Sequence, residues 1–188
     1  MRRIVDIVVS VSGMVIFAPV VLVIAIIIKT TSHGSVLYRQ RRVGQHTIPF
    51  VIYKFRTMRT GSDKQGLATL LNDSRVTAIG KFIRPLHLDE LPQLWNMLCG
   101  QMTLIGPRPR SVEHCAEIRR FIPDFDKRHS VKPGLTGLAQ IGKNHDHSEE
   151  GLREGFALDM KYLLTSSFFS DLRIIAMTVL VVVKRKGV

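Results

Sequence analysis

The sequence predicts a helix-rich protein of the α+β class that is anchored in a membrane. The first 30 residues are dominated by one long apolar run, which indicates a membrane helix. Beyond it, two short segments rich in β-branched and aromatic residues predict a small β-hairpin, and later apolar residues recur mostly at helical spacing. We therefore expect an anchoring helix over residues 1–30 and one folded domain over residues 31–188.

The balance of charges indicates an anionic partner. The chain has 27 Lys and Arg against 15 Asp and Glu, a formal net charge of +12. A surplus of this size suits nucleic acid, phospholipid headgroups or a phosphorylated substrate. Aromatic residues make up only 7% of the chain, and no stretch alternates them with basic residues as a surface for single-stranded nucleic acid would. The sequence also carries no motif of a nucleic-acid-binding fold, so we expect no nucleic-acid partner.

The two cysteines predict no covalent framework. Cys99 and Cys115 form no CxxC pair and have no disulfide or metal-ligand spacing. Such thiols are typical of reduced, partly buried residues in a protein that faces the cytosol.

The N-terminal apolar run is long enough for a membrane. It extends from Ile7 to Ile28, and its 22 residues, at about 1.5 Å each, could cross a hydrocarbon core of roughly 30 Å. A signal peptide fits less well, because the run is longer than a usual hydrophobic region and no A-x-A site follows it. A buried helix of a soluble protein is the remaining alternative to a membrane anchor.

Pro19, inside this run, argues against a straight spanning helix. Its ring removes one backbone donor and clashes with the carbonyl four residues back, so we expect a kink near Ala18. Arg2 and Arg3 precede the run and Lys29 follows it, so the positive-inside rule does not place its ends on opposite sides. A kinked helix that enters one leaflet and returns satisfies both observations, and we favour this re-entrant topology over a spanning one.

The hairpin is expected over residues 35–43 and 48–57, with "GQHT" between the strands. Its second strand contains "YKFRTM", in which Lys54 and Arg56 stand two residues apart and therefore on one face. The polar stretch 59–73 predicts a loop.

The stretch "LDELPQLWNML" predicts a short amphipathic helix. Pro92 suits the first turn of a helix, so the helix should begin at Asp89 or Glu90. Two interpretations of these carboxylates stay open. Either one caps the helix and the other complements its dipole, or the pair serves chemistry.

The C-terminal half adds helices and one glycine-rich segment. Residues 113–120 and 156–164 predict helices, and residues 132–142 predict a turn region whose glycines let the backbone approach a ligand. The apolar stretch 172–183 is too short to span a bilayer and precedes three basic residues. We expect it to be an amphipathic element at the membrane interface or in the core.

The two carboxylates and several cations suit phosphoryl transfer. A carboxylate at a helix N-terminus lies in a positive field that lowers its pKa, and it can attack phosphorus to form an acyl phosphate. A neighbouring carboxylate can hold Mg²⁺, which usually accompanies diphosphates. The absence of GxxxxGK[ST] from the sequence excludes a P-loop enzyme. The cations that would neutralise phosphate oxygens are Lys54, Arg56, Arg84, Arg108 and Arg110.

Other charged clusters have simpler explanations. Arginines also bind anionic lipids without catalysis, and we expect this of a second set. The set is Arg41, Arg42, Arg119 and Arg120. His145 and His147 alternate with acidic residues in "NHDHSEE", but no third spaced ligand is evident, so we expect a solvated loop there.

Taken together, the motifs resemble the bacterial sugar transferases: monotopic polyprenyl-phosphate phosphoglycosyl transferases, here of the small type that consists of the catalytic domain alone. The resemblance covers nearly the whole chain. It rests on the apolar N-terminal segment with its proline, followed in order by "YKFRTM", "LDELPQLWNML", "GQMTLIGPRPR", "KPGLTGLAQI" and "LDMKYL". Several motifs in one order are specific, whereas any one of them would be weak.

The resemblance implies a reaction and a role for each matching residue. Asp89 would attack the β-phosphate of a UDP-sugar, UMP would leave, and a polyprenyl phosphate such as undecaprenyl phosphate would take the phospho-sugar from the enzyme. Glu90 would orient Mg²⁺ or assist proton removal from the acceptor, so both carboxylates are candidate metal ligands. The motif positions that would line the phosphate and nucleotide region are Lys54, Arg56, Arg84, Arg108, Pro109 and Arg110.

The resemblance also implies a location and a pathway step. A re-entrant helix would leave the catalytic domain on the cytoplasmic face of the bacterial inner membrane, bound to the phospholipid bilayer, where it would initiate a lipid-linked exopolysaccharide or lipopolysaccharide. The family commonly has Ser before the membrane proline, where this chain has Ala18. The sugar stays open, and so does assembly into a homodimer. The competing function is a non-catalytic membrane scaffold that binds anionic lipid, and it predicts that Asp89→Asn is harmless.

Overall fold

The computed structural model describes residues 2–62, 73–142 and 148–183 of the chain. It is helix-rich α+β, as the sequence predicts, with one antiparallel and one parallel pair of strands. The α-helices are α1 (Arg2–Thr31), α2 (Ala78–Ile83), α3 (Gln93–Leu98), α4 (Val112–Ile118), α5 (Leu138–Ile141), α6 (Glu149–Thr165) and α7 (Phe168–Val183). The strands are β1 (Leu37–Val43), β2 (Pro49–Phe55), β3 (Thr103–Ile105) and β4 (Gly134–Thr136). Short 3-10 segments are η1 (Gln45–Thr47), η3 (Arg84–Leu86), η4 (Leu88–Glu90) and η5 (Pro123–Ser130).

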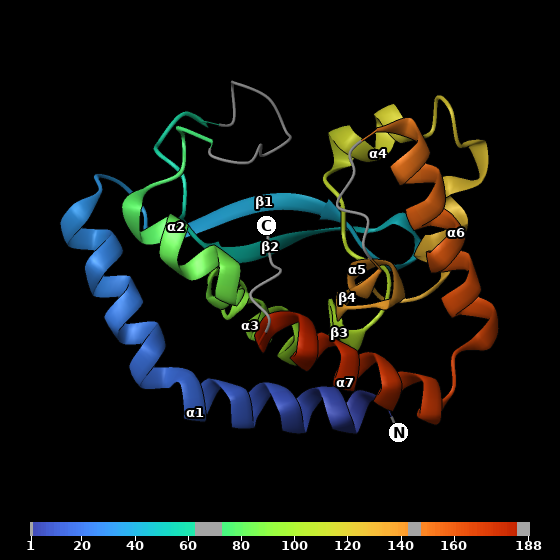
Figure 1. Cartoon of the computed structure of the whole chain (residues 1–188), viewed down its shortest axis with the longest axis horizontal. Helices are drawn as coiled ribbons and strands as arrows, with labels where there is room; N and C mark the ends of the chain where they lie inside the picture. The colour runs from blue at the N-terminus through green and yellow to red at the C-terminus, as the bar shows by residue number, and fades with distance from the viewer. Residues whose placement is uncertain (1, 63–72, 143–147, 184–188) are drawn as a thin grey trace.

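The N-terminal helix α1 is bent, as Pro19 predicts. Figure 1 shows a first arm along the base of the molecule and a second arm that rises beside α2. By length and composition this helix could cross a membrane. Most of its apolar side chains are exposed, among them Val15 at 71% and Ile16 at 68%. The residues of α1 that are buried are Asp6, Ser10, Ile24 and Ile28.

The first arm is fastened to the domain by polar contacts. The buried Asp6 carboxylate accepts hydrogen bonds from the Thr103 hydroxyl and the Leu104 N–H, both at 2.9 Å. Arg3 donates to two carbonyls at the end of α3, at 2.7 and 2.6 Å. A buried carboxylate is costly unless it is hydrogen-bonded, so these contacts stabilise the arm in its place against the domain.

The second arm packs into the core of the same domain. Its Ile24 and Ile28 are buried in one cluster with Phe55 and Ile83. The ends of a straight helix of 30 residues would lie about 45 Å apart. The bend is therefore what allows both arms to contact one domain.

Strands β1 and β2 form the predicted hairpin. They pair antiparallel, with Tyr38 opposite Lys54 and Arg42 opposite Phe50. The free edge of β2 is covered by α3, where the buried Asn96 amide accepts from one backbone N–H of β2 at 3.1 Å and donates to one of its carbonyls at 2.7 Å. This contact holds α3, and the turn before it, beside the strand that carries Lys54.

The glycine-rich segment 132–142 contains more structure than the predicted turn region. It forms strand β4, which lies parallel to β3, and then α5. A Cβ atom on Gly134 would overlap the Gly106 N–H, so the close approach requires glycine. Gly106 donates to the Thr136 carbonyl at 2.8 Å and Gly134 to the Pro107 carbonyl at 3.0 Å. The strand pair thereby fixes the start of the loop at residues 106–110.

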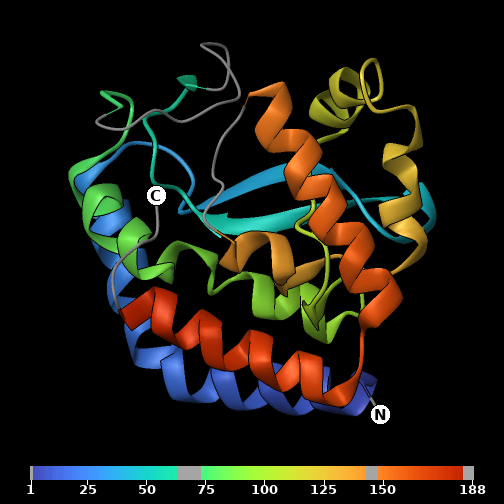
Figure 2. The same cartoon turned by 45° about the vertical axis from the view of Figure 1, so that its right-hand side comes forward.

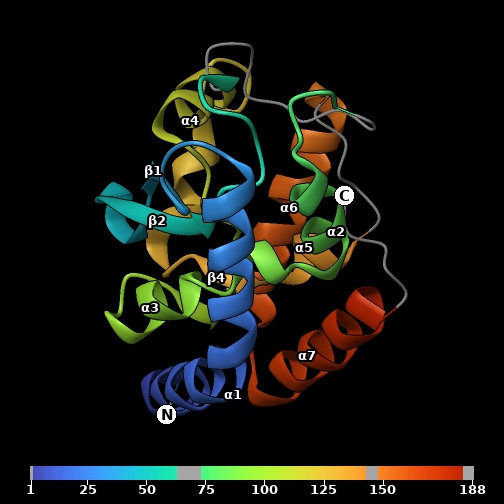
Figure 3. The same ribbon diagram turned by 90° about the vertical axis from the view of Figure 1, so that its left-hand side faces the viewer.

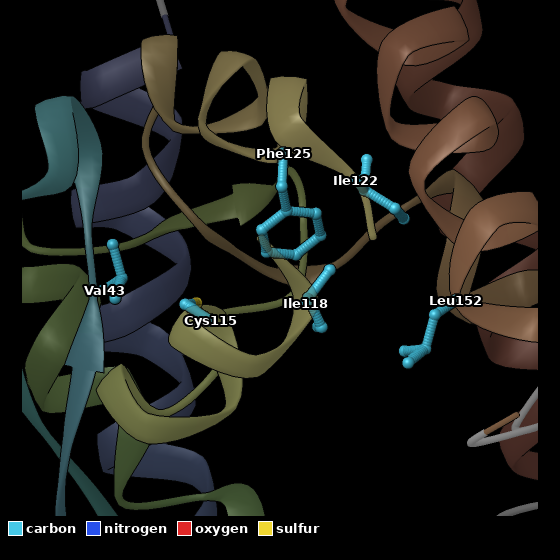
Figure 4. Close-up of a cluster of buried hydrophobic side chains, with 6 residues drawn as sticks. All are labelled: Val43, Cys115, Ile118, Ile122, Phe125 and Leu152. Carbon is cyan, nitrogen blue, oxygen red and sulfur yellow. The ribbon is translucent and has the colours of Figure 1, made fainter. Parts of the chain in front are cut away.

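A hydrophobic cluster joins the hairpin to α4 and α6 (Figure 4). Cys115 lies in it and is fully buried, and burial raises the pKa of its thiol. Cys99 is exposed, and both thiols are free. The buried members of the cluster are Val43, Cys115, Ile118, Ile122, Phe125 and Leu152.

Helix α7 lies beside the first arm of α1 and forms the base of the molecule with it (Figures 2 and 3). Arg2 pairs with Asp171 at 3.1 Å between the two helices. The helix begins four residues before the predicted stretch, and Phe168 and Phe169 in its first turn are 72% and 81% exposed. The predicted solvated loop with His145 and His147 lies outside the described residues.

Candidate active site

The carboxylates Asp89 and Glu90 both lie in η4, the second of two consecutive 3-10 segments. His87 joins η3 to η4 with its backbone in the left-handed region, at φ 54°. The backbone bonds here run over three residues, as from the Leu91 N–H to the Leu88 carbonyl, and α3 begins only at Gln93. The expectation that Asp89 or Glu90 begins or caps the helix is therefore wrong. Both carboxylates are buried instead.

Glu90 is held between two cations. Its Oε1 accepts from Lys54 Nζ at 2.5 Å and from Arg108 Nη2 at 2.6 Å. Burial alone would raise the pKa of Glu90, but the charges of Arg108 and Lys54 and the hydrogen bonds they donate outweigh it and hold the pKa well below its usual range. Glu90 is thus a permanent anion that fixes one cation from β2 and one from the 106–110 loop.

The pKa of Asp89 is shifted in the opposite direction to that of Glu90. It is 9% exposed, and no described residue donates a hydrogen bond to its carboxylate. Burial raises its pKa and the charge of Glu90 adds to the rise, whereas Lys54 and Arg84 oppose it without outweighing it. The lowered pKa expected from a helix dipole is therefore wrong for this residue. A poorly solvated carboxylate beside cations is a candidate nucleophile.

The predicted cations Arg84 and Arg56 have different surroundings. Arg84 donates from Nε to the Thr57 hydroxyl at 2.9 Å, and its charge acts on Asp89. Arg56 follows the last residue of β2, whereas Lys54 lies within the strand. Its buried guanidinium donates to the carbonyls of Ser32 and His33 at 2.8 Å each, which ties the hairpin to the end of α1.

The loop that carries Arg108, Pro109 and Arg110 is held in place by Arg128. Arg128 donates to the Arg108 carbonyl at 2.8 Å and forms a buried ion pair with Asp159, also at 2.8 Å. Of the two arginines in this loop, Arg108 is the one whose guanidinium donates a hydrogen bond to Glu90. Burial, together with the charge of Arg128, lowers the pKa of Arg110 to about 10.

Arg42 belongs to this region, although the sequence reasoning assigned it to lipid binding. It donates from Nη1 to the Pro109 carbonyl at 2.9 Å, and its buried Nε has no hydrogen-bond partner among the residues that the structure describes. Burial and the charge of Arg108 lower its pKa to about 10. The strand period of two puts Arg42 on one face of β1 with Tyr38, and the register of the hairpin, which pairs Tyr38 with Lys54, is the further information that links this face to the site.

The chemistry of the two carboxylates suits a Mg²⁺ ion only if a substrate supplies further ligands. Mg²⁺ in proteins is usually bound by one or two carboxylates together with substrate phosphates and waters. Within the described part of the chain, Asp89 has no hydrogen-bond partner and Glu90 Oε2 has only a long contact of 3.5 Å with Arg108, so both offer oxygen ligands. Among the described residues, no three side chains gather into a metal site that would bind an ion by itself.

Fold and site together define a class: a membrane-associated protein with a buried carboxylate pair faced by cations. The chain belongs to the bacterial sugar transferase family, whose sequence profile matches residues 1–185, and this confirms the resemblance stated above.

Three curated relatives illustrate the family. A UDP-glucose:undecaprenyl-phosphate glucose-1-phosphate transferase of Klebsiella pneumoniae is 42% identical over 95% of this chain, and one of Caulobacter vibrioides is 40% identical over the same share. A UDP-N-acetylgalactosamine-undecaprenyl-phosphate N-acetylgalactosaminephosphotransferase of Aeromonas hydrophila is 38% identical, again over 95% of this chain. The chain spans 39%, 68% and 42% of the lengths of these relatives, in that order.

Proposed function

We propose that the protein is a membrane-bound phosphoglycosyl transferase. It moves a sugar 1-phosphate from a UDP-sugar to a polyprenyl phosphate such as undecaprenyl phosphate, releases UMP, and so begins a lipid-linked surface glycan. The observation that carries this proposal is the contrast between two adjacent carboxylates: Glu90 is bound by two cations, whereas Asp89 is buried and pairs with none of the described residues. The names of the relatives support the classes of donor and acceptor.

The first step is attack by Asp89 on the donor. A carboxylate oxygen of Asp89 forms a bond to the β-phosphorus, the bond from that phosphorus to the bridging oxygen breaks, and UMP leaves with the electron pair. The product on the enzyme is an acyl phosphate that carries the sugar. Arg108 and Lys54, positioned through Glu90, and Arg84 stabilise the negative charge on the transferring group.

The second step is attack by the acceptor. An oxygen of the polyprenyl phosphate bonds to the same phosphorus, the bond to Asp89 breaks, and the carboxylate is restored. A phosphate monoester has a second pKa of about 6, so at neutral pH the acceptor attacks mainly as a dianion and needs no base. This agrees with the low pKa of Glu90, which makes it a poor base and suits it to hold the cations instead.

Mg²⁺ would be held by the donor diphosphate together with Asp89 or the Oε2 atom of Glu90. When bound, it would neutralise charge on the diphosphate and help UMP to leave.

We further propose that the protein is monotopic and lies on the cytoplasmic face of the inner membrane. The contacts of Asp6 and Arg3 at one end of α1 and of Ile28 at the other support a re-entrant helix, because all of them are with one domain. The exposed apolar side chains of the first arm and of α7 would then lie among the lipids. A donor soluble in water and an acceptor with its phosphate at headgroup depth could meet at such a site.

The test is release of UMP by purified protein in nanodiscs supplied with Mg²⁺, undecaprenyl phosphate and a panel of UDP-sugars that includes UDP-glucose and UDP-N-acetylgalactosamine. We expect UMP from at least one donor, and near-total loss of release in Asp89→Asn. Release of UDP would contradict the assigned bond. An Asp89→Asn variant as active as the wild type, or a wild type that releases nothing, would favour the lipid-binding scaffold.

A further inference from the structure

A groove lined by apolar side chains lies beside the turn that carries Asp89. It lies between the second arm of α1 and helix α2, which run beside one another in Figures 1 and 2, and its volume is about 310 Å³. Its lining includes Pro19, at the bend of α1, and Leu88, the residue before Asp89. The groove therefore joins the membrane helix to the turn that carries the candidate nucleophile.

The groove has a fixed floor and open walls. Ile24 and Ile83 on the floor are 4% and 1% exposed and belong to a packed core cluster. Phe82 and Val23 on the walls are 67% and 54% exposed. Exposed apolar surface of this kind marks a site for an apolar ligand.

The side chains that line the groove are apolar, and a cation lies next to them in the chain. Arg84 follows Ile83 directly, is fixed by Thr57 at 2.9 Å, and acts electrostatically on Asp89. A ligand with an apolar chain in the groove would thus place an anionic head beside this guanidinium and next to the carboxylate.

We propose that this groove binds the first isoprene units of the polyprenyl phosphate acceptor, with the phosphate at Arg84. The proposal rests on the proposed function. A polyprenyl phosphate has a single chain attached directly to a phosphate monoester, which fits one apolar groove with one cation, Arg84, next to its lining residue Ile83. A bilayer phospholipid has two chains and a glycerol between them and its phosphate, so it fits this shape less well.

The first test compares two variants that each remove one exposed phenylalanine. Phe82→Ala removes a wall of the groove, and Phe169→Ala removes a side chain of similar exposure from α7. We expect Phe82→Ala to raise the KM for undecaprenyl phosphate about tenfold, and Phe169→Ala to change it by no more than about twofold. The burst of UMP without acceptor counts the folded, donor-competent sites in each preparation. Equal effects of the two variants on this KM would overturn the proposal.

The second test uses the wild-type protein and so does not depend on how the variants fold. A benzophenone-bearing isoprenoid phosphate should cross-link to peptides from the second arm of α1 or from α2, and undecaprenyl phosphate should compete with it. Competition by phosphatidylglycerol to the same extent would assign the groove to bilayer chains, and labelling elsewhere would also overturn the proposal. Failure of the proposed function is distinguishable, because the wild type would then release no UMP from any donor.

Discussion

The buried ion pair between Arg128 and Asp159 gives a prediction whose size follows from the structure. The two side chains are 2% and 7% exposed, and Arg128 Nε lies 2.8 Å from Asp159 Oδ2. Asp159→Asn keeps the shape and one acceptor oxygen but removes the charge that balances the guanidinium. Loss of one partner of a buried pair costs about 3–5 kcal/mol, and we expect the lower end because the acceptor is kept.

For a chain of this size, each kcal/mol lowers the Tm by about 2–4 °C, so about 3 kcal/mol corresponds to roughly 6–12 °C. Thermal unfolding in nanodiscs measures this shift. The matched control is Asp124→Asn, which breaks an ion pair of similar length, 2.7 Å, between side chains that are 67% and 65% exposed. Such surface pairs contribute about 0–1 kcal/mol.

Asp159→Asn should also slow UMP release, because Arg128 holds the carbonyl of Arg108 and through it the partner of Glu90. A Tm shift no larger than that of Asp124→Asn would refute the reasoning that burial makes this charge costly to leave unpaired.

Three further predictions concern the carboxylates and the membrane helix. Since burial raises the pKa of Asp89, the rate of the UMP burst should fall with decreasing pH at a pH above the ordinary aspartate pKa of about 3.9. Arg84→Gln removes a charge that lowers this pKa, so the acid limb of the pH–rate profile should move to higher pH, and a move to lower pH would contradict the assignment. The pKa of Glu90 is depressed, so its stabilising effect is complete above about pH 4.3 and is lost as the pH falls below that value. Glu90→Gln should therefore lower the Tm at pH 7 and flatten the dependence of Tm on acid pH, and an unchanged Tm at pH 7 would refute this. Pro19→Ala should straighten α1 toward a spanning helix, so a cysteine tag at the N-terminus should become reactive from the far side of the membrane, and a tag that stays cytoplasmic would argue against the bend as the cause of the topology.

Local sequence patterns were sufficient for the hairpin and the bend of α1. Enrichment in β-branched and aromatic residues predicts the hairpin of β1 and β2, and Pro19 predicts the bend, because both effects arise within a few residues. The period of two did not predict which face of β1 meets the site, so Arg42 was assigned to lipid. Assigning Arg42 to the site requires the register of the hairpin and the position of the Pro109 carbonyl.

Long-range contacts explain the features that the sequence did not predict. Strand β4 pairs with β3 across some thirty residues, and glycines at the contact gave a turn signal instead of a strand signal. The pKa of Asp89 depends on burial and on the charge of Glu90, whereas the sequence argument considered only a helix terminus. The same limit applies to Arg56, whose spacing from Lys54 suggested one face although the two side chains have different partners.

The central claim is that Asp89 forms a covalent bond to the phospho-sugar, and trapping that adduct tests it most directly. Protein in nanodiscs would be mixed with Mg²⁺ and a UDP-sugar labelled in its β-phosphate, without acceptor, then quenched and digested. We expect label on the peptide that contains Asp89, loss of the label on addition of undecaprenyl phosphate, no label in Asp89→Asn, and normal labelling in Asp124→Asn. UMP release with no label on the protein, or label that persists in Asp89→Asn, would contradict the assignment of Asp89 as the nucleophile.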